Sequence, residues 1–105
     1  MKQKILGSPA HQWTRNDNLA DGGKTYMDST GTHGGFGIIR VGDNEEYGYF
    51  GFSSSGVITL ITNSANITTT EDNAGKFNIF NAAGFVGFNN ELGSIKNILV
   101  VAWFS

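Results

Sequence analysis

The sequence contains few of the residues that would give it covalent cross-links, strong charge or a membrane span. It has no cysteine, so disulfides cannot staple the fold and cysteine usage gives no clue to the redox compartment. Charged residues make up 15% of the chain, and the net charge is −2. No broad basic field exists to hold nucleic acid or an anionic membrane surface. The longest apolar run is too short to span a bilayer as a helix. We therefore expect no nucleic-acid partner and no membrane insertion.

The length of 105 residues suits one domain with one modest core. The first part of the chain is polar and rich in turn residues, as in Asn16-Asp17-Asn18. We predict that residues 1–24 form a polar linker, with room for one or two short strands in the first 34 residues, and that residues 25–105 form a single domain. A compact domain without disulfides often gains stability by oligomerisation.

Short strand-like segments separated by turn residues begin at residue 35. Their recurrence, at intervals of about 8–12 residues, is typical of a sandwich or a barrel. No window combines helical spacing of apolar residues with capping residues, so we expect almost no helix. The sequence predicts an all-β fold, a β-sandwich of jelly-roll type. The expected strands are 35–41, 46–52, 57–62, 66–70, 76–80, 85–88 and one within 96–105.

The run KNILVVAWFS, residues 96–105, is the longest apolar stretch. In a strand, its even-numbered and odd-numbered residues would face opposite sides, and both sides are apolar. A strand at the surface of a monomeric sheet would alternate apolar with polar residues. The strand is therefore either central in a two-layer fold or half-buried against another subunit. We predict an oligomer interface formed by Leu99, Val101 and Trp103.

Glycine is abundant, with 15 residues against one proline. Several glycines fall inside predicted strands, where glycine marks a bulge, a bend or a close backbone approach. Aromatic residues flank most of them. We expect strongly coiled strands in which aromatic rings cover bare backbone. The glycines in question are Gly37, Gly48, Gly51 and Gly87.

No motif predicts catalysis or metal binding. Gly35-Phe36-Gly37 lacks the third glycine of a dinucleotide-binding loop, because Arg40 stands in its place. His11 and His33 are the only histidines, and a metal site needs three or four ligands. A trimer could still gather three copies of one histidine on its axis. No Gly-x-Ser-x-Gly elbow occurs. We expect neither an enzyme nor a bound cofactor or metal ion.

Aromatic and amide side chains are the candidates for ligand binding. Trp13, Tyr47 and Tyr49 could stack on the apolar faces of sugars, and Asn73 and Asn90 could supply amide hydrogen bonds from turns. The alternative is that the tyrosines line the second face of a sheet and the asparagines make turns. Both interpretations stay open at this stage.

Two segments, STGTHGGFGIIRVGDNEEYGYFGF (29–52) and KNILVVAWFS (96–105), resemble the C-terminal globular domains of bacteriophage tail-fibre and head-fibre proteins. The resemblance covers about residues 25–105. It implies a compact homotrimer on the virion surface, with the last strand near the threefold axis, which binds a host-surface receptor or glycan non-covalently. The rival hypotheses are a monomeric carbohydrate-binding module and, third, a small hydrolase.

Overall fold

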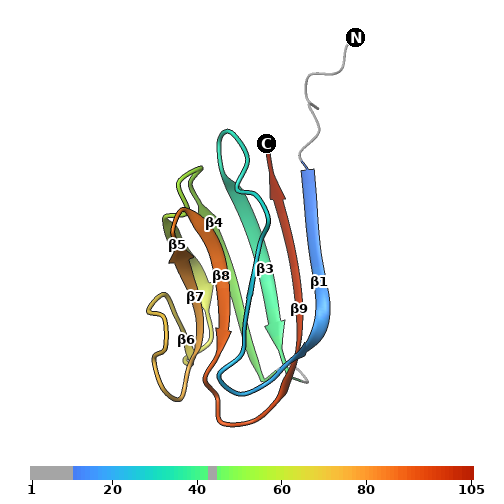
Figure 1. Ribbon diagram of the computed structural model, residues 1–105, viewed down its shortest axis with the longest axis vertical. Helices are drawn as coiled ribbons and strands as arrows, with labels where there is room; N and C mark the ends of the chain where they lie inside the picture. The colour runs from blue at the N-terminus through green and yellow to red at the C-terminus, as the bar shows by residue number, and fades with distance from the viewer. Residues whose placement is uncertain (1–10, 43–44) are drawn as a thin grey trace.

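The computed structural model describes residues 11–42 and 45–105 (Figure 1). Residues 1–10 of the predicted linker, and Asp43 and Asn44 of a predicted turn, lie outside this part. The described chain forms two packed sheets and no helix, which confirms the all-β sandwich. The jelly-roll description stays a prediction. The strands are β1 (His11–Leu19), β2 (Lys24–Tyr26), β3 (Gly35–Val41), β4 (Glu46–Phe52), β5 (Ile58–Asn63), β6 (Ile67–Thr68), β7 (Phe77–Ala82), β8 (Phe85–Asn90) and β9 (Lys96–Phe104).

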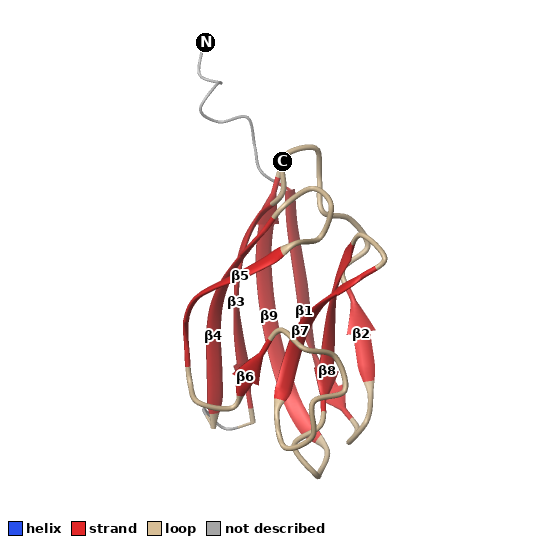
Figure 2. Cartoon of the chain, turned by 90° about the vertical axis from the view of Figure 1, so that its left-hand side faces the viewer, coloured by secondary structure: helices blue, strands red, loops and turns tan. Residues whose placement is uncertain are grey.

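The first sheet has the strand order β1-β9-β3-β4-β5, and the second has the order β2-β8-β7-β6. All pairs are antiparallel except β6 and β7, which run parallel. The strands follow the long axis of the molecule, and the loops gather at its two ends (Figure 2). β9 lies between β1 and β3, which is the first of the two alternatives that the sequence left open, a central strand in a two-layer fold.

The N-terminal part of the described chain corrects the predicted boundary. Residues 11–19 form a nine-residue edge strand of the first sheet rather than a linker, and β2 begins at Lys24. β1 pairs with β9 over its whole length. Trp13 and Leu19 also pack against the hydrophobic core. Pairing and partial burial thus make this polar segment an edge strand of the sandwich.

The core fills the space between the sheets and comes from alternating positions along the strands. In β4, Phe50 and Phe52 are buried while Tyr47 and Tyr49 point outward, as the sequence predicts. In β9, the even-numbered apolar residues are buried and the odd-numbered ones are only partly covered. The largest buried apolar side chains are Phe50, Phe77, Phe88, Met27, Ile39, Ile79 and Ile98.

Two strand glycines lie directly under aromatic rings, as expected. A Cβ at Gly37 would be 2.7 Å from Cζ of Phe50, and one at Gly87 would be 2.5 Å from Cζ of Phe80. Any other residue at these positions would have to displace the ring. Bare backbone therefore lets the rings lie close to the sheet.

Candidate functional site

The outward face of the first sheet carries apolar side chains across its three central strands, β9, β3 and β4. Phe36 is 56% exposed and Tyr49 is 50% exposed. On β9, the predicted interface residues Leu99, Val101 and Trp103 are half-buried on this face. We call this surface the outer band; its residues are Phe36, Ile38, Tyr47, Tyr49, Leu99, Val101 and Trp103.

The strand register arranges the outer band in rows across the sheet. Residues directly opposite each other in antiparallel strands share a face. One row runs Gln12, Trp103, Phe36, Gly51 and Thr59. The next runs Thr14, Val101, Ile38, Tyr49 and Thr62, and the third runs Asn16, Leu99, Arg40 and Tyr47.

Each row begins with a polar residue on β1, and the first two rows end in a threonine on β5. The centres of the rows are apolar or aromatic, except that Arg40, the one charged residue among them, lies in the third row. The rings of Phe36 and Trp103 lie 5.3 Å apart between centroids, tilted by 31°. An apolar centre with a polar margin is the anatomy of a protein interface. Contiguous exposed apolar surface of this kind also marks a binding face.

Sequence reasoning found the β9 and β4 members of this face but missed Phe36, Ile38 and Arg40 of β3. The signal was present, because Phe36 and Ile38 alternate with Gly37 and Ile39. Because β3 pairs with β4 on one side and with β9 on the other, these residues lie between the tyrosines and the β9 residues.

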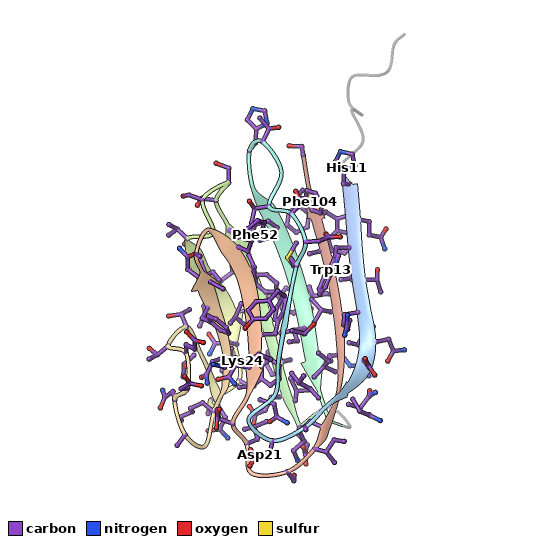
Figure 3. The ribbon with its side chains drawn as sticks, in the orientation of Figure 1. His11, Trp13, Asp21, Lys24, Phe52 and Phe104 are labelled. Atoms are coloured by element: carbon purple, nitrogen blue, oxygen red, sulfur yellow. The ribbon has the colours of Figure 1, made fainter. Side chains whose placement is uncertain are left out.

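Trp13 lies apart from the tyrosines, on the inward face of β1. It extends from β1 into the molecule (Figure 3). Its ring stacks on Phe88 of the second sheet, with centroids 5.8 Å apart and planes 7° from parallel. Trp13 therefore closes the edge of the sandwich, which is a packing role.

The two candidate asparagines occupy different places again. Asn90 is fully buried, and its amide nitrogen donates to the carbonyls of Leu19 (2.8 Å) and Ser94 (2.9 Å). Its side-chain oxygen accepts from the Leu92 N–H at 3.0 Å. This corrects the expectation of an accessible binding amide, because every polar atom of Asn90 is engaged inside the protein. Asn73 is half-buried in the β6–β7 loop, where its carbonyl accepts from Lys76 N–H at 3.3 Å.

Buried amides also join loops elsewhere in the second sheet. Asn78 and Asn89 are fully buried, and their amide groups lie 3.0 Å apart. The Asp72 N–H donates to the side-chain oxygen of Asn89 at 3.0 Å, in a turn where Asp72 has a φ of 60°. Asn78, Asn89 and Asn90 thus make hydrogen bonds inside the protein at this end of the sandwich.

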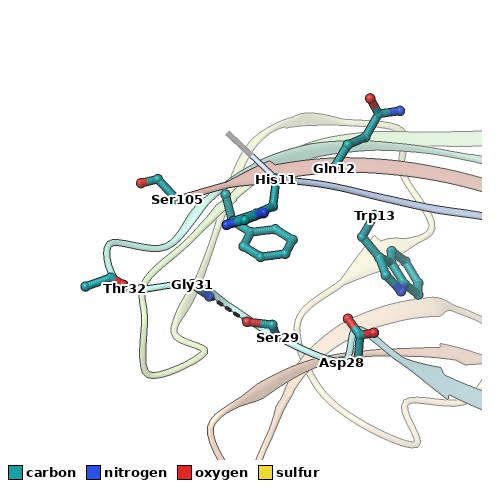
Figure 4. A pocket seen from close by; sticks show the side chains of 9 residues that line it. His11, Gln12, Trp13, Asp28, Ser29, Gly31, Thr32 and Ser105 are labelled. Carbon is teal, nitrogen blue, oxygen red and sulfur yellow. Dashed lines mark hydrogen bonds between the residues drawn. The ribbon is translucent and has the colours of Figure 1, made fainter. Parts of the chain in front are cut away.

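A groove of about 580 Å³ opens between β1 and the loop that follows β2 (Figure 4). His11, Trp13, Asp28 and Ser29 contribute to its lining. The His11 ring packs against Phe104, with centroids 5.5 Å apart. The Gly31 N–H donates to Ser29 Oγ at 3.1 Å, and this hydrogen bond lies within the loop that lines the groove. The groove offers one carboxylate and one imidazole, which is too few for a metal site.

Two ionisable side chains have shifted pKa values, and both lie in structural contacts. Hydrogen bonds to Glu71 and Asp72 raise the pKa of Lys24 above its ordinary value. For Glu46, burial alone would raise the pKa, but hydrogen bonds from Ser64 and Asn66 outweigh it and lower the pKa. Glu46 accepts from Ser64 Oγ at 2.5 Å and from Asn66 Nδ2 at 3.0 Å. This contact fastens the β5–β6 turn to β4.

Within residues 11–42 and 45–105, no group of three or more His, Cys, Asp or Glu side chains could hold a metal ion. The same residues contain no helix with the length and apolar character needed to cross a bilayer. Comparison with protein-family models, with curated proteins and with solved structures finds no match to this chain.

Proposed function

We propose that the protein is a structural assembly module whose subunits associate through the outer band. The single observation that carries the proposal is the apolar content of a sheet face that the sandwich itself leaves uncovered. Burial of apolar surface is the dominant favourable term in most protein–protein association. Aromatic residues at the centre of a contact contribute most of the binding energy. Phe36, Trp103 and Tyr49 fit that role.

The assembly we propose is a homotrimer, and the resemblance to bacteriophage fibre domains supports this stoichiometry. In such an arrangement the outer bands of three subunits face a common axis, and β9 contributes three residues to each contact. The module would stand at the surface of a virion. Attachment to a host receptor or glycan would use several copies at once, so that weak individual sites act together through effective concentration.

A second candidate function is a monomeric carbohydrate-binding module. The specific observation in its favour is the set of exposed rings on a regular sheet face, with Arg40 beside Tyr47 in one row. Flat rings can stack on sugars while neighbouring polar groups donate hydrogen bonds. This function needs the outer band open to solvent, whereas assembly needs it covered.

Light scattering on matched variants separates the two functions. We expect the wild type to have a mass near three times 11.3 kDa. Ile38→Lys places a charge in the middle of the outer band and should abolish this association. Thr62→Lys, in the same row but outside the band, should leave the mass unchanged.

A wild type that is monomeric at micromolar concentration would contradict the assembly proposal. If that monomer bound a glycan array and Tyr49→Ala lost the signal with an unchanged melting temperature, the carbohydrate-binding function would replace it.

A further inference from the structure

Among the described strands, β1 forms one of the two edges of the first sheet, the other being β5, and it pairs with β9 on one side only. We propose that this edge binds β1 of a second copy, antiparallel, about a twofold axis that passes beside Asn16. The contact is separate from the outer band, and it would join two five-stranded sheets into one continuous sheet. Three observations carry the proposal: unpaired backbone groups, complementary charges and complementary apolar residues.

The direction of the β1 backbone groups follows from the neighbouring strands. The Gly42 N–H donates to the Asn97 carbonyl at 2.8 Å, so the backbone N–H and C=O groups of Asn97 point toward β3. Successive strand residues direct their polar groups to opposite sides, so Ile98, Val100, Ala102 and Phe104 direct theirs toward β1. Their partners are the odd-numbered residues of β1. The even-numbered residues Gln12, Thr14, Asn16 and Asn18 therefore direct N–H and C=O groups away from the sheet.

Within the described part of the chain, no strand pairs with this edge of β1. The Asn18 N–H donates locally to the Asp17 carboxylate at 2.8 Å, as expected for a group outside the ladder. In the proposed pair, the two Asn16 residues face each other and exchange backbone hydrogen bonds, and Thr14 and Asn18 do the same across the axis. An unprotected row of this kind is a template for strand addition.

The side chains of β1 are complementary about Asn16. Antiparallel pairing places Arg15 opposite Asp17 of the second copy, and Trp13 opposite Leu19. Both are non-hydrogen-bonded pairs, in which side chains approach most closely, with Cα atoms about 4.5 Å apart. The twofold axis repeats each pair, so two ion pairs lie between two apolar pairs.

The contacts and exposure of these four side chains in the single subunit are compatible with the pairing. Arg15 and Asp17 form an ion pair at 3.5 Å within one strand, with 44% and 58% of their side chains exposed. Trp13 and Leu19 are half-buried against the core, and each keeps an open side. A second strand would cover that side and extend the core across the axis.

The charges also select one register. With Arg15 at the axis, two guanidinium groups would face each other, and with Asp17 at the axis two carboxylates would. Like charges directly opposite in a sheet are destabilising. Inward-pointing charges usually block edge pairing, but about Asn16 they neutralise each other. The charges therefore disfavour the registers centred on Arg15 and Asp17, and the register about Asn16 places opposite charges together.

A contact of one strand with another is small beside the roughly 1,600 Å² of a standard interface. We therefore expect a concentration-dependent dimer that weakens as salt is added, because exposed ion pairs are screened.

Sedimentation velocity in the Ile38→Lys background tests the pairing without the outer band. The expected result is a dimer at high protein concentration. Arg15→Asp should yield a monomer, because four carboxylates would meet at the axis, and Asp17→Arg should do the same with four guanidinium groups. The double variant Arg15→Asp/Asp17→Arg should restore the dimer. Arg40→Asp makes the same charge change on the outer face and should leave the dimer intact.

Asn16→Pro supplies a second test, since proline removes an outward N–H without touching the ladder to β9. This variant should be monomeric in sedimentation velocity, and thermal melting should show that it is folded. A chain that stays monomeric at every concentration, or a double swap that fails to restore association, would overturn the proposal and leave the edge to another partner. If the dimer persists while Ile38→Lys leaves the wild-type mass unchanged, the edge pairing stands and the outer-band function fails.

Discussion

Gly37→Ala should destabilise the protein through a collision that the structure localises to one ring. The new Cβ would be 2.7 Å from Cζ of Phe50 and 3.0 Å from the carbonyl oxygen of Val101. Phe50 is fully buried, with its ring centroid 6.1 Å from that of Phe52 and 5.9 Å from that of Phe88. The ring therefore has little room to move, and the Val101 oxygen belongs to the ladder between β3 and β9.

The magnitude follows from two opposing terms. Overpacking a well-filled core typically costs about 1–3 kcal/mol. Alanine restricts the unfolded chain more than glycine does, which returns about 0.4–1 kcal/mol. We expect a net loss of about 1–2 kcal/mol in the free energy of unfolding. Each kcal/mol corresponds to a fall of about 4–8 °C in Tm for a domain of 60–100 residues.

Urea and thermal unfolding followed by circular dichroism measure this loss. The matched control is Gly51→Ala on β4, where the nearest atom to an added Cβ is the Gly35 oxygen at 3.8 Å. The control should be neutral or slightly more stable than wild type. Phe50→Leu should cost stability alone but less in the Gly37→Ala background, because a smaller side chain admits the methyl group. Equal stability of the two alanine variants would refute the reasoning.

Three further changes test other parts of the structure. Deletion of residues 98–105 should abolish cooperative unfolding, because each large buried side chain of β9 contributes about 1.5–3 kcal/mol to a total of about 5–15 kcal/mol; a cooperative melt at a similar temperature would show that the strand is peripheral. Asn90→Ala should cost about 1–3 kcal/mol by leaving buried carbonyls unpaired, whereas exposed Asn97→Ala should cost far less, and equal losses would contradict the internal role of Asn90. The lowered pKa of Glu46 means that its stabilisation is present above its ordinary value of 4.5 and is lost as pH falls through the native value. The stability gap between wild type and Glu46→Gln should thus be larger at pH 7 than at pH 3 in urea titrations, and an unchanged gap would exclude the charge of Glu46 as its source.

Periodicity predicted the strands whose residues alternate clearly between the two faces. Predicted segments 35–41 and 46–52 coincide with β3 and β4, and the C-terminal run became β9. Their β-branched and aromatic residues favour strands wherever they pack. The prediction of a linker over residues 1–24 was wrong for β1, because Asn16, Asp17 and Asn18 have low strand propensity. Its pairing with β9 overrides that propensity, and no local pattern reveals a partner so distant in sequence.

The candidate site was predicted in part for a related reason. An asparagine between two turns has the same local sequence whether its amide faces solvent, as predicted for Asn90, or joins the end of β1 to the β8–β9 loop inside the protein, as observed. The face of Tyr47 and Tyr49 was predictable from alternation along β4. Their neighbours on β3 depended on register, which only the assembled sheet defines.

The position of β9 between β1 and β3 has a consequence for the order of events during synthesis. β1 leaves the ribosome first among the described strands, yet its partner is the last of them. Until β9 arrives, the hairpin of β3 and β4 presents an open edge, and β1 has nothing to pair with in the first sheet. Completion of the sheet requires β9 to pair with β1 on one side and with β3 on the other. Contacts so distant along the chain fold slowly, and edges exposed in the meantime favour aggregation. The strands of this sheet are therefore most vulnerable to wrong pairing in the interval before β9 emerges.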